Sequence, residues 1–255
     1  MSVTIAISGK GGSGKTTIAA MIVRHLVEGR DRSVLAVDAD PNACLGLALG
    51  VEAETTVADI REQTLERKLQ PSPGVNREVA VEYAIHRAVA EAHGFDLLTM
   101  GQPEGPKCYC AVNHLLRKYL DAAAQDYAFV ILDNEAGMEH LSRRTTDAVD
   151  LLVVAAEPTP IGAKTAGRIL GLASRLPITV RRTGVVWNKV DRPDRVAAVA
   201  DALPTLAQVP FDPAVAEAAM AGASVFDLPA DTPALAAVGD VLARTLDIEP
   251  HHDAS

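Results

Sequence analysis

The residues with the most definite chemistry lie near the start of the chain, in the run from Gly9 to Thr17. Its residues Gly9 to Thr16 fit the pattern G-x-x-x-x-G-K-[ST], in which glycines let backbone N–H groups curl around phosphate oxygens. It follows an apolar segment and opens a helical one, whose N-terminus adds partial positive charge. Lys15 is placed to reach the outer phosphates of a nucleotide, and the Thr16 hydroxyl to coordinate Mg²⁺. A glycine-rich turn without a ligand is the alternative. The pattern predicts an ATP or GTP site formed by Gly11, Gly12, Ser13, Gly14, Lys15, Thr16 and Thr17.

Carboxylates follow two other apolar runs. Asp38 and Asp40 come after the second run, and side chains at i and i+2 of an extended segment face the same side. One of them can orient an attacking water while the other supports the metal shell. Asp133 ends a later apolar run, where an aspartate that caps the next turn is the alternative.

A candidate base site lies late in the chain. Asn188 ends an apolar run, and its amide offers both a donor and an acceptor to an adenine edge. We expect Asn188, Lys189 and Pro210 to line the base site, although a simple proline turn also explains Pro210. The letters from Asn188 to Asp191 match the guanine signature Asn-Lys-x-Asp, so the residues alone leave the base open.

Two cysteines, Cys108 and Cys110, lie close together between a strand and a helix. Lys107 and a helix N-terminus favour the thiolate that binds metal. Two thiolates are half of a closed soft-metal site, and an isologous dimer would supply the other half. Both nickel and zinc accept thiolate ligands, so the spacing does not distinguish these metals. The alternatives to a metal site are two buried core thiols or a redox pair. We expect the third cysteine, Cys44, to be a small buried hydrophobic residue.

The elements that must position these residues alternate along the chain. Short apolar runs alternate with amphipathic ones, which is typical of βαβ units and a parallel sheet covered on both faces. Strands are predicted at 3–8, 33–38, 95–100, 129–133, 151–155 and 183–187, and helices at 17–28, 78–93, 113–124, 164–176 and 233–246. We therefore expect one doubly wound α/β domain over residues 1–255, with a disordered tail from about 249.

The net charge and the distribution of apolar residues limit the kinds of partner and the compartment that we expect. The formal charge of −9 disfavours non-specific binding to nucleic acid or to anionic lipid, because both need a basic surface. The helix at 233–246 has little positive charge on its polar face, so we expect it to pack on the core rather than on a membrane. Without a signal peptide or a long apolar run, we expect a cytoplasmic protein.

The second lysine of the phosphate loop, Lys10, resembles the deviant Walker A signature of the MinD, ParA and nitrogenase iron protein superfamily. That resemblance implies P-loop topology, ATP rather than GTP, and a nucleotide-dependent homodimer in which Lys10 reaches the partner's nucleotide. It also implies that Asp40 positions water, that Asp38 belongs to a switch, and that Asp133 is the Walker B aspartate. Catalysis is then expected from Lys10, Lys15 and Asp40, and Mg²⁺ binding from Thr16, Asp38 and Asp133.

A narrower resemblance rests on the segment 105–117 together with 133–144, which is similar to the CooC-type nickel-insertion ATPases of carbon monoxide dehydrogenase maturation. It implies ATP and ADP as nucleotides, Ni²⁺ held by Cys108 and Cys110, with Zn²⁺ possible there, and carbon monoxide dehydrogenase or acetyl-CoA synthase as client. The alternatives are a ParA- or MinD-like positioning ATPase and an iron-sulfur electron donor.

Overall fold

The computed structural model describes residues 2–29, 33–65, 77–102, 117–120, 126–135, 148–175, 178–200 and 202–246. The cysteine pair Cys108 and Cys110, residues 136–147 and the predicted tail lie outside these ranges. For these segments the expectations drawn from the sequence stay predictions.

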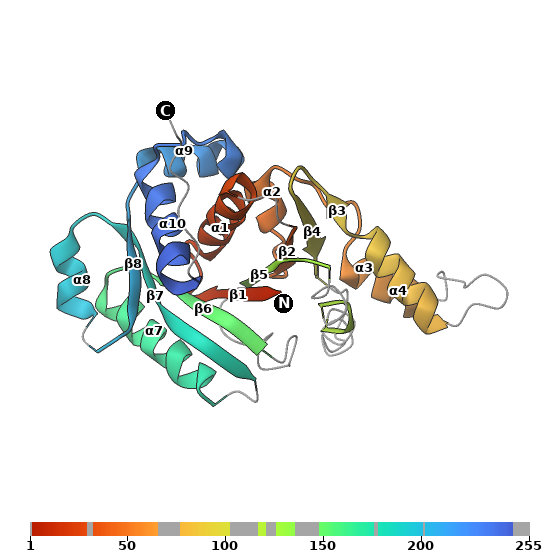
Figure 1. The fold of residues 1–255 in the computed structure, drawn as a ribbon, viewed down its shortest axis with the longest axis horizontal. Coiled ribbons are helices and arrows are strands. Elements are labelled where there is room, and N and C mark those ends of the chain that lie inside the picture. The colour runs from red at the N-terminus through yellow and green to blue at the C-terminus, as the bar shows by residue number, and fades with distance from the viewer. Residues whose placement is uncertain are drawn as a thin grey trace.

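One sheet of eight strands organises the described chain, in the spatial order β3-β4-β2-β5-β1-β6-β7-β8 (Figure 1). Every neighbouring pair runs parallel except β3 and β4, which pair antiparallel at one edge. The strands are β1 (Val3–Gly9), β2 (Val34–Ala39), β3 (Ala90–Glu91), β4 (Phe95–Thr99), β5 (Phe129–Asn134), β6 (Ala148–Ala156), β7 (Thr179–Val190) and β8 (Thr205–Pro210). The predicted fold class, a doubly wound and mainly parallel sheet, is confirmed.

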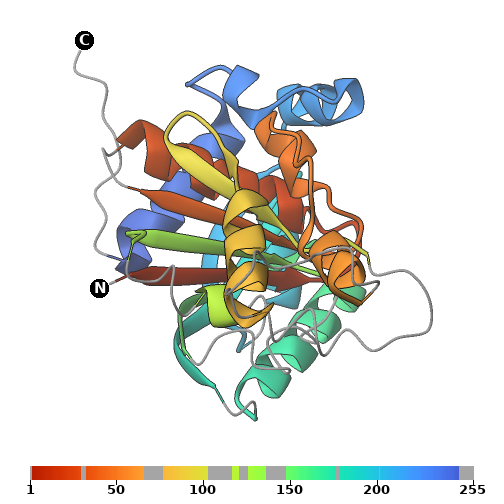
Figure 2. The same cartoon turned by 90° about the vertical axis from the view of Figure 1, so that its right-hand side faces the viewer.

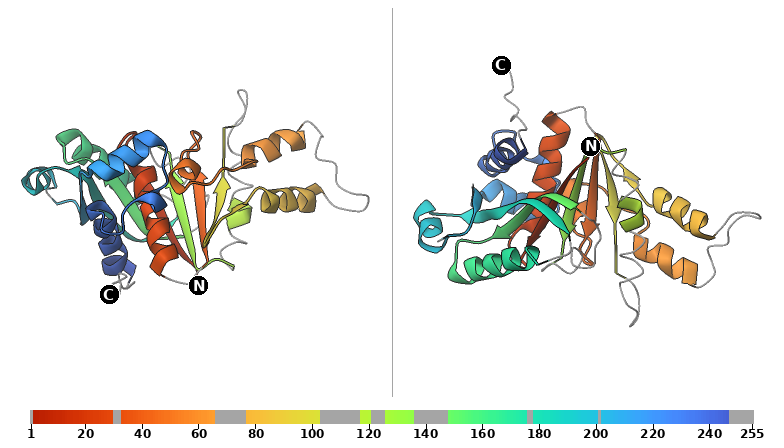
Figure 3. Two further views of the ribbon diagram at one scale, coloured as in Figure 1. Left: turned by 90° about the horizontal axis from the view of Figure 1, so that it is seen from above. Right: turned by 60° about the horizontal axis from the view of Figure 1, so that its bottom comes forward.

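Helices cover both faces of this sheet, and α1 and α10 lie on the face opposite α7 (Figure 3). At one end of the molecule, α3 and α4 extend side by side, as Figure 2 shows from that end. The helices are α1 (Lys15–Gly29), α2 (Leu45–Leu49), α3 (Val57–Leu65), α4 (Arg77–Arg87), α7 (Pro160–Ala173), α8 (Pro193–Val199), α9 (Pro213–Ala221), the 3-10 helix η1 (Val225–Asp227) and α10 (Pro233–Leu246).

The central strands are buried along their whole length because helices cover them from both sides, and they are apolar up to the carboxylates at their carboxyl ends. Every residue of β2 and β5 is buried, and alternate side chains enter two separate cores. Ile131 belongs to the core that contains residues of α1 and α10, whereas Leu132 belongs to the core on the opposite face, which contains residues of α7. Burial on both faces explains why these strands have continuous apolar runs rather than an alternating pattern.

Local signals account for several helix ends. The Thr159 hydroxyl accepts the backbone N–H of Gly162 at 3.0 Å, and Pro160 occupies the first turn, so α7 begins one turn before the predicted start. At the end of α9, Gly222 has φ of 66°, the left-handed conformation that closes many helices.

One predicted helix is wrong in its second half. The expected helix at 78–93 ends at Arg87, and Ala90–Glu91 forms β3, which pairs with β4. Pairing with the exposed edge of β4 satisfies backbone groups there, and this tertiary contact overrides local helix propensity. Strand β8 and helices α2, α3, α8 and α9 were not predicted individually, because they are short or only partly buried.

No helix in the described ranges is long and apolar enough to cross a membrane.

A matched pair of leucines tests the position of the core. Leu152 in β6 is fully buried, whereas Leu47 in α2 is 62% exposed. Leu152→Ala should lower the free energy of unfolding by about 2–5 kcal/mol, since it leaves a cavity in the core on the face of the sheet that α7 covers. Leu47→Ala should change it by less than about 0.5 kcal/mol. Urea unfolding followed by circular dichroism measures both, and equal losses would contradict this assignment of the core.

Candidate nucleotide and magnesium site

The residues singled out from the sequence meet at one edge of the sheet. Strands β1, β2, β5, β6, β7 and β8 run in the same direction, so their carboxyl ends lie along one line. The phosphate loop, Asp38, Asp133 and Asn188 all come from these ends. This is the edge at which open parallel sheets place ligands.

The phosphate loop connects β1 to α1 and is closed by its own hydrogen bonds. The Ser13 hydroxyl donates to the Lys10 carbonyl oxygen at 2.8 Å, and the Ser13 backbone N–H donates to the same oxygen at 3.2 Å. Gly12 and Gly14 have φ of 81° and 88°, a region that other residues rarely adopt. Lys15 begins α1 and is 7% exposed, so its ammonium group lies within the site.

Gly14 has a second reason to be glycine. A Cβ atom on this residue would lie 2.1 Å from Nδ2 of Asn188. That Nδ2 group donates to the Ser13 carbonyl oxygen at 2.9 Å. The Asn188 side chain at the end of β7 therefore packs directly against the backbone of the loop, and any larger residue at position 14 would displace this amide.

A place for Mg²⁺ is formed by Thr16 and Asp133. The Thr16 hydroxyl donates to Oδ2 of Asp133 at 2.7 Å, while Oδ1 of Asp133 is buried and has no hydrogen-bond partner. A buried carboxylate oxygen without a partner is costly unless a cation or water satisfies it. Hydroxyl and carboxylate oxygens are the ligands that Mg²⁺ prefers, so these residues fit the metal.

Burial shifts the ionisation of both strand-end carboxylates. It raises the pKa of Asp133 to about 6, although the Thr16 hydrogen bond and the charge of Lys15 act in the opposite direction. It raises the pKa of Asp38 to about 7, and the charge of Asp133, its neighbour across β2 and β5, adds to the effect. A bound cation would favour the ionised forms of both groups.

Asp38 and Asp40 also shape the backbone that follows β2. Asp38 accepts the backbone N–H of Leu45 at 2.7 Å and that of Asp40 at 3.2 Å, which holds the start of α2 against the site. Asp40 is partly exposed and accepts the backbone N–H of Asn42 at 2.9 Å. The expected roles of Asp38 at Mg²⁺ and of Asp40 on water stay predictions.

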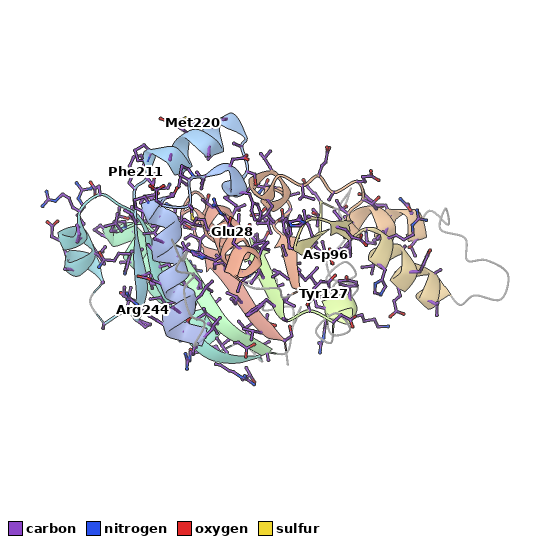
Figure 4. All side chains as sticks on the ribbon, turned by 45° about the horizontal axis from the view of Figure 1, so that its top comes forward. Glu28, Asp96, Tyr127, Phe211, Met220 and Arg244 are labelled. Carbon is purple, nitrogen blue, oxygen red and sulfur yellow. The ribbon has the colours of Figure 1, made fainter. Side chains whose placement is uncertain are left out.

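A small cavity of about 130 Å³ lies beside the first turns of α1. It is mostly apolar, and its lining includes Asn188, Lys189 and Pro210, so the structure brings together the residues predicted for the base. Phe211 lines it as well and is 54% exposed, close to the start of α9 (Figure 4). Base recognition by these residues stays a prediction.

A larger cavity of about 320 Å³ lies on the other side of the loop, between the loop and the start of α7. The exposed residue Lys10 lines this cavity together with Glu157, Thr159 and Ile161. Sequence reasoning missed Glu157. Its position directly after β6 was the available signal, since charged residues at strand ends of a parallel sheet tend to face the ligand edge.

The cysteines divide into two cases. Cys108 and Cys110 fall outside the described residues, but the strand that precedes them, β4, ends at the same edge as the nucleotide site. The prediction that Cys44 is buried is wrong: Cys44 is exposed at the N-terminal end of α2. It lies in the turn that leaves the sheet edge, beyond the reach of the two cores. Among the described residues, no group of three or more His, Cys, Asp and Glu side chains could hold a metal ion.

Comparison with known proteins agrees with this geometry. Residues 4–225 match the model of the CobQ/CobB/MinD/ParA nucleotide binding domain. An uncharacterized ATP-binding protein of Methanocaldococcus jannaschii is 40% identical over 88% of this chain and 91% of its own length. The carbon monoxide dehydrogenase accessory protein CooC of Rhodospirillum rubrum is 35% identical over 88% of this chain and 89% of its own.

Solved structures confirm the fold. The septum site-determining protein MinD of Pyrococcus horikoshii, solved with Mg-ADP, superposes with a TM-score of 0.70 at 23% identity, over 97% of this chain and 96% of its own. MinD of Aquifex aeolicus in its complex with MinC gives a TM-score of 0.72 at 20% identity, over 99% of each chain.

The fold and the site together define a P-loop ATPase of the MinD and ParA superfamily. The chain belongs to the CobQ/CobB/MinD/ParA nucleotide-binding domain family, and CooC is one of its homologues.

The magnesium site gives a pH-dependent prediction. Asp133→Asn should weaken the Mg²⁺-dependent part of ADP binding by about 10- to 100-fold, because a charged partner is lost. In the unaltered protein this part should also weaken as the pH falls through about 6, where Asp133 gains a proton. ADP affinity measured by calorimetry with and without Mg²⁺, at pH 5.5 and 8, checks both.

Two comparisons make this prediction specific. The phosphates of the nucleotide also titrate between these pH values. Their contribution is the same in Asp133→Asn and in the unaltered protein, so the difference between the two proteins reports on Asp133. Asp191→Asn, on the surface after β7, should behave as the unaltered protein. If Mg²⁺ dependence survives Asp133→Asn at both pH values, Asp133 does not hold the metal.

Proposed function

We propose that this chain is an ATP-hydrolysing metallochaperone that dimerises with nucleotide and delivers nickel to carbon monoxide dehydrogenase, or to acetyl-CoA synthase, during maturation. The observation that carries the proposal is the 35% identity to the carbon monoxide dehydrogenase accessory protein CooC over 88% of the chain. The Cys108 and Cys110 pair, in the segment that resembles this group, supplies the thiolates that a soft metal needs.

The residues at the sheet edge divide the work on ATP. The loop amides and Lys15 hold the phosphates, and the Thr16 hydroxyl and Asp133 hold Mg²⁺, which supplies charge stabilisation when bound. In this proposal Asp40, which is partly exposed beyond the end of β2, orients the attacking water. Catalysis of this kind depends on positioning and charge, because the protein itself forms no bond to the phosphoryl group.

The residues around the small cavity that we expect to hold the base support ATP over GTP. In the guanine signature the final aspartate recognises the base, but here Asp191 pairs with Arg195 at 2.7 Å and does not line the small cavity. The cavity wall is mostly apolar, which suits the face of an adenine. The letters Asn-Lys-Val-Asp therefore do not require a guanine site.

A short backbone path supports coupling between nucleotide and metal. The Met100 backbone N–H, just beyond β4, donates to the Asp38 carbonyl oxygen at 2.8 Å, and Ala58 of α3 donates to the Met100 carbonyl oxygen at 2.9 Å. Asp38 also holds the start of α2 through Leu45. A movement of Asp38 during hydrolysis would thus reach the segment that leads into the cysteine pair.

Metal binding is the first test. We expect the double variant Cys108→Ala/Cys110→Ala to lose about one Ni²⁺ or Zn²⁺ per dimer, the count for one thiolate tetrahedron shared by two subunits. ATPase activity should remain, since the residues that we expect to bind the nucleotide include neither cysteine. Reduced protein is titrated with each metal alone, with ADP and with a non-hydrolysable ATP analogue, while light scattering follows the mass.

Cys44→Ala is the matched control, because it removes an exposed thiol outside the pair and should leave metal binding unchanged. Unchanged metal binding in the double variant would remove the cysteine pair from the mechanism. A ParA- or MinD-like positioning ATPase would then be the better-supported function. Brown anaerobic protein with an absorption shoulder would instead point to the iron-sulfur alternative.

Dimerisation gives a separate prediction. Lys10→Ala should keep ADP binding but lose the dimer formed with the ATP analogue, and its hydrolysis should slow by about 10²–10³-fold, as when one charge-stabilising donor is removed. The exposed residue Lys164 on α7 provides the control Lys164→Ala. Light scattering and phosphate release measure both variants, and a Lys10→Ala protein that still dimerises and hydrolyses ATP would refute the role of Lys10.

A further inference from the structure

Two neighbouring carbonyl groups of the phosphate loop are held by two neighbouring side chains of β7. Asn188 donates through Nδ2 to the Ser13 carbonyl oxygen at 2.9 Å, and Lys189 donates through Nζ to the Gly12 carbonyl oxygen at 2.8 Å. In a trans peptide the C=O and the following N–H point in opposite directions. Fixing these two carbonyls therefore fixes the directions of the Ser13 and Gly14 N–H groups.

The backbone of Lys189 is in an unusual conformation. Its φ is 57°, in the left-handed region that costs a residue with a Cβ free energy. The Lys189 backbone N–H donates to Oδ1 of Asn188 at 2.9 Å, so the amide of Asn188 is engaged at both ends. This strained turn directs the two side chains back toward the loop, where a regular strand would send them to opposite faces.

Glu157 completes the arrangement from another strand. Its Oε1 accepts from Nζ of Lys189 at 2.8 Å, so one ammonium group joins the residue after β6 to the loop. Both side chains are a little under half exposed, at 43% and 45%. An unanchored lysine at this exposure would sample many rotamers, and the carboxylate restricts it to the one that reaches Gly12.

We propose that Glu157 and Lys189 are positioning residues for nucleotide binding: Glu157 anchors Lys189, and Lys189 holds the phosphate loop in the shape that receives phosphates. Lys189 then acts through the loop backbone and not through the base, which differs from the role expected from its sequence position. Asn188 contributes the parallel contact to Ser13. The inference rests on nucleotide binding at this loop, which is part of the proposed function, and is independent of metal delivery.

The arrangement predicts a loss of affinity with little change in turnover. Lys189→Met should weaken Mg-ADP binding by about tenfold, the loss expected for one hydrogen bond from a charged donor. Glu157→Gln should weaken it by about threefold, as for a partly exposed ion pair. The rate at saturating ATP should stay within about twofold, because neither residue contacts the reacting atoms.

The experiment measures the dissociation constant of Mg-ADP by calorimetry and, with ATP, kcat and KM for each variant of the full chain. Lys189→Arg should restore near-normal affinity, since a guanidinium group can pair with Glu157 and still donate to the Gly12 carbonyl. The double variant Glu157→Gln/Lys189→Met should bind no more weakly than Lys189→Met alone, because the carboxylate acts through the lysine.

Arg195→Met is the matched control. It breaks an ion pair of similar exposure with Asp191 beside the same strand end, without touching the loop. Unchanged affinity in Lys189→Met, an equal loss in Arg195→Met, or a fall in kcat at unchanged affinity would each overturn the proposal.

Should Lys189→Met fail to fold, as judged by thermal unfolding, the isosteric Glu157→Gln and the Lys189→Arg variants decide the question. Loss of ADP affinity with normal metal binding would separate this result from any failure of the metallochaperone proposal.

Discussion

Two buried carboxylates on neighbouring strands set the conditions for the rest of the site. Asp38 and Asp133 lie side by side in the register of β2 and β5, both nearly without solvent contact. Their ionised forms repel each other, and burial penalises both charges, so their pKa values rise toward neutrality. The fold tolerates this cost because Lys15 and the Thr16 hydroxyl act on Asp133 and the backbone N–H groups of Leu45 and Asp40 bond to Asp38. One Asp133 oxygen stays available for a cation.

The same edge of the sheet joins the nucleotide site to two other regions. On one side, β6 and β7 send Glu157, Asn188 and Lys189 to the back of the phosphate loop. On the other side, the backbone of Asp38 bonds to Met100, just before the cysteine segment. Hydrogen bonds therefore connect the nucleotide site to segments on both sides of it, and the proposed coupling of nucleotide and metal would act through the Met100 side.

Sequence reasoning succeeded where a residue's role depends on its immediate neighbours. The phosphate loop requires glycines, a lysine and a threonine at fixed spacing, and the apolar runs of β1, β2, β5, β6 and β7 are long and doubly buried. It failed where distant contacts decide. Ala90–Glu91 forms a strand because β4 has a free edge, and Cys44 is exposed because the chain turns away from the core there. Neither fact has a local signal.

By itself, the sequence determined the class of fold, the nucleotide loop and the residues whose chemistry suits Mg²⁺ and a soft metal, because short motifs and periodicity encode them. The tertiary structure decided which side chains hold the loop and how the carboxylates share charge. The sequence predicts that Lys189 contacts the base, which stays a prediction, and the structure adds its hydrogen bonds to Gly12 and Glu157. Such partners lie far apart in the chain, and only the parallel packing of strands brings their ends together.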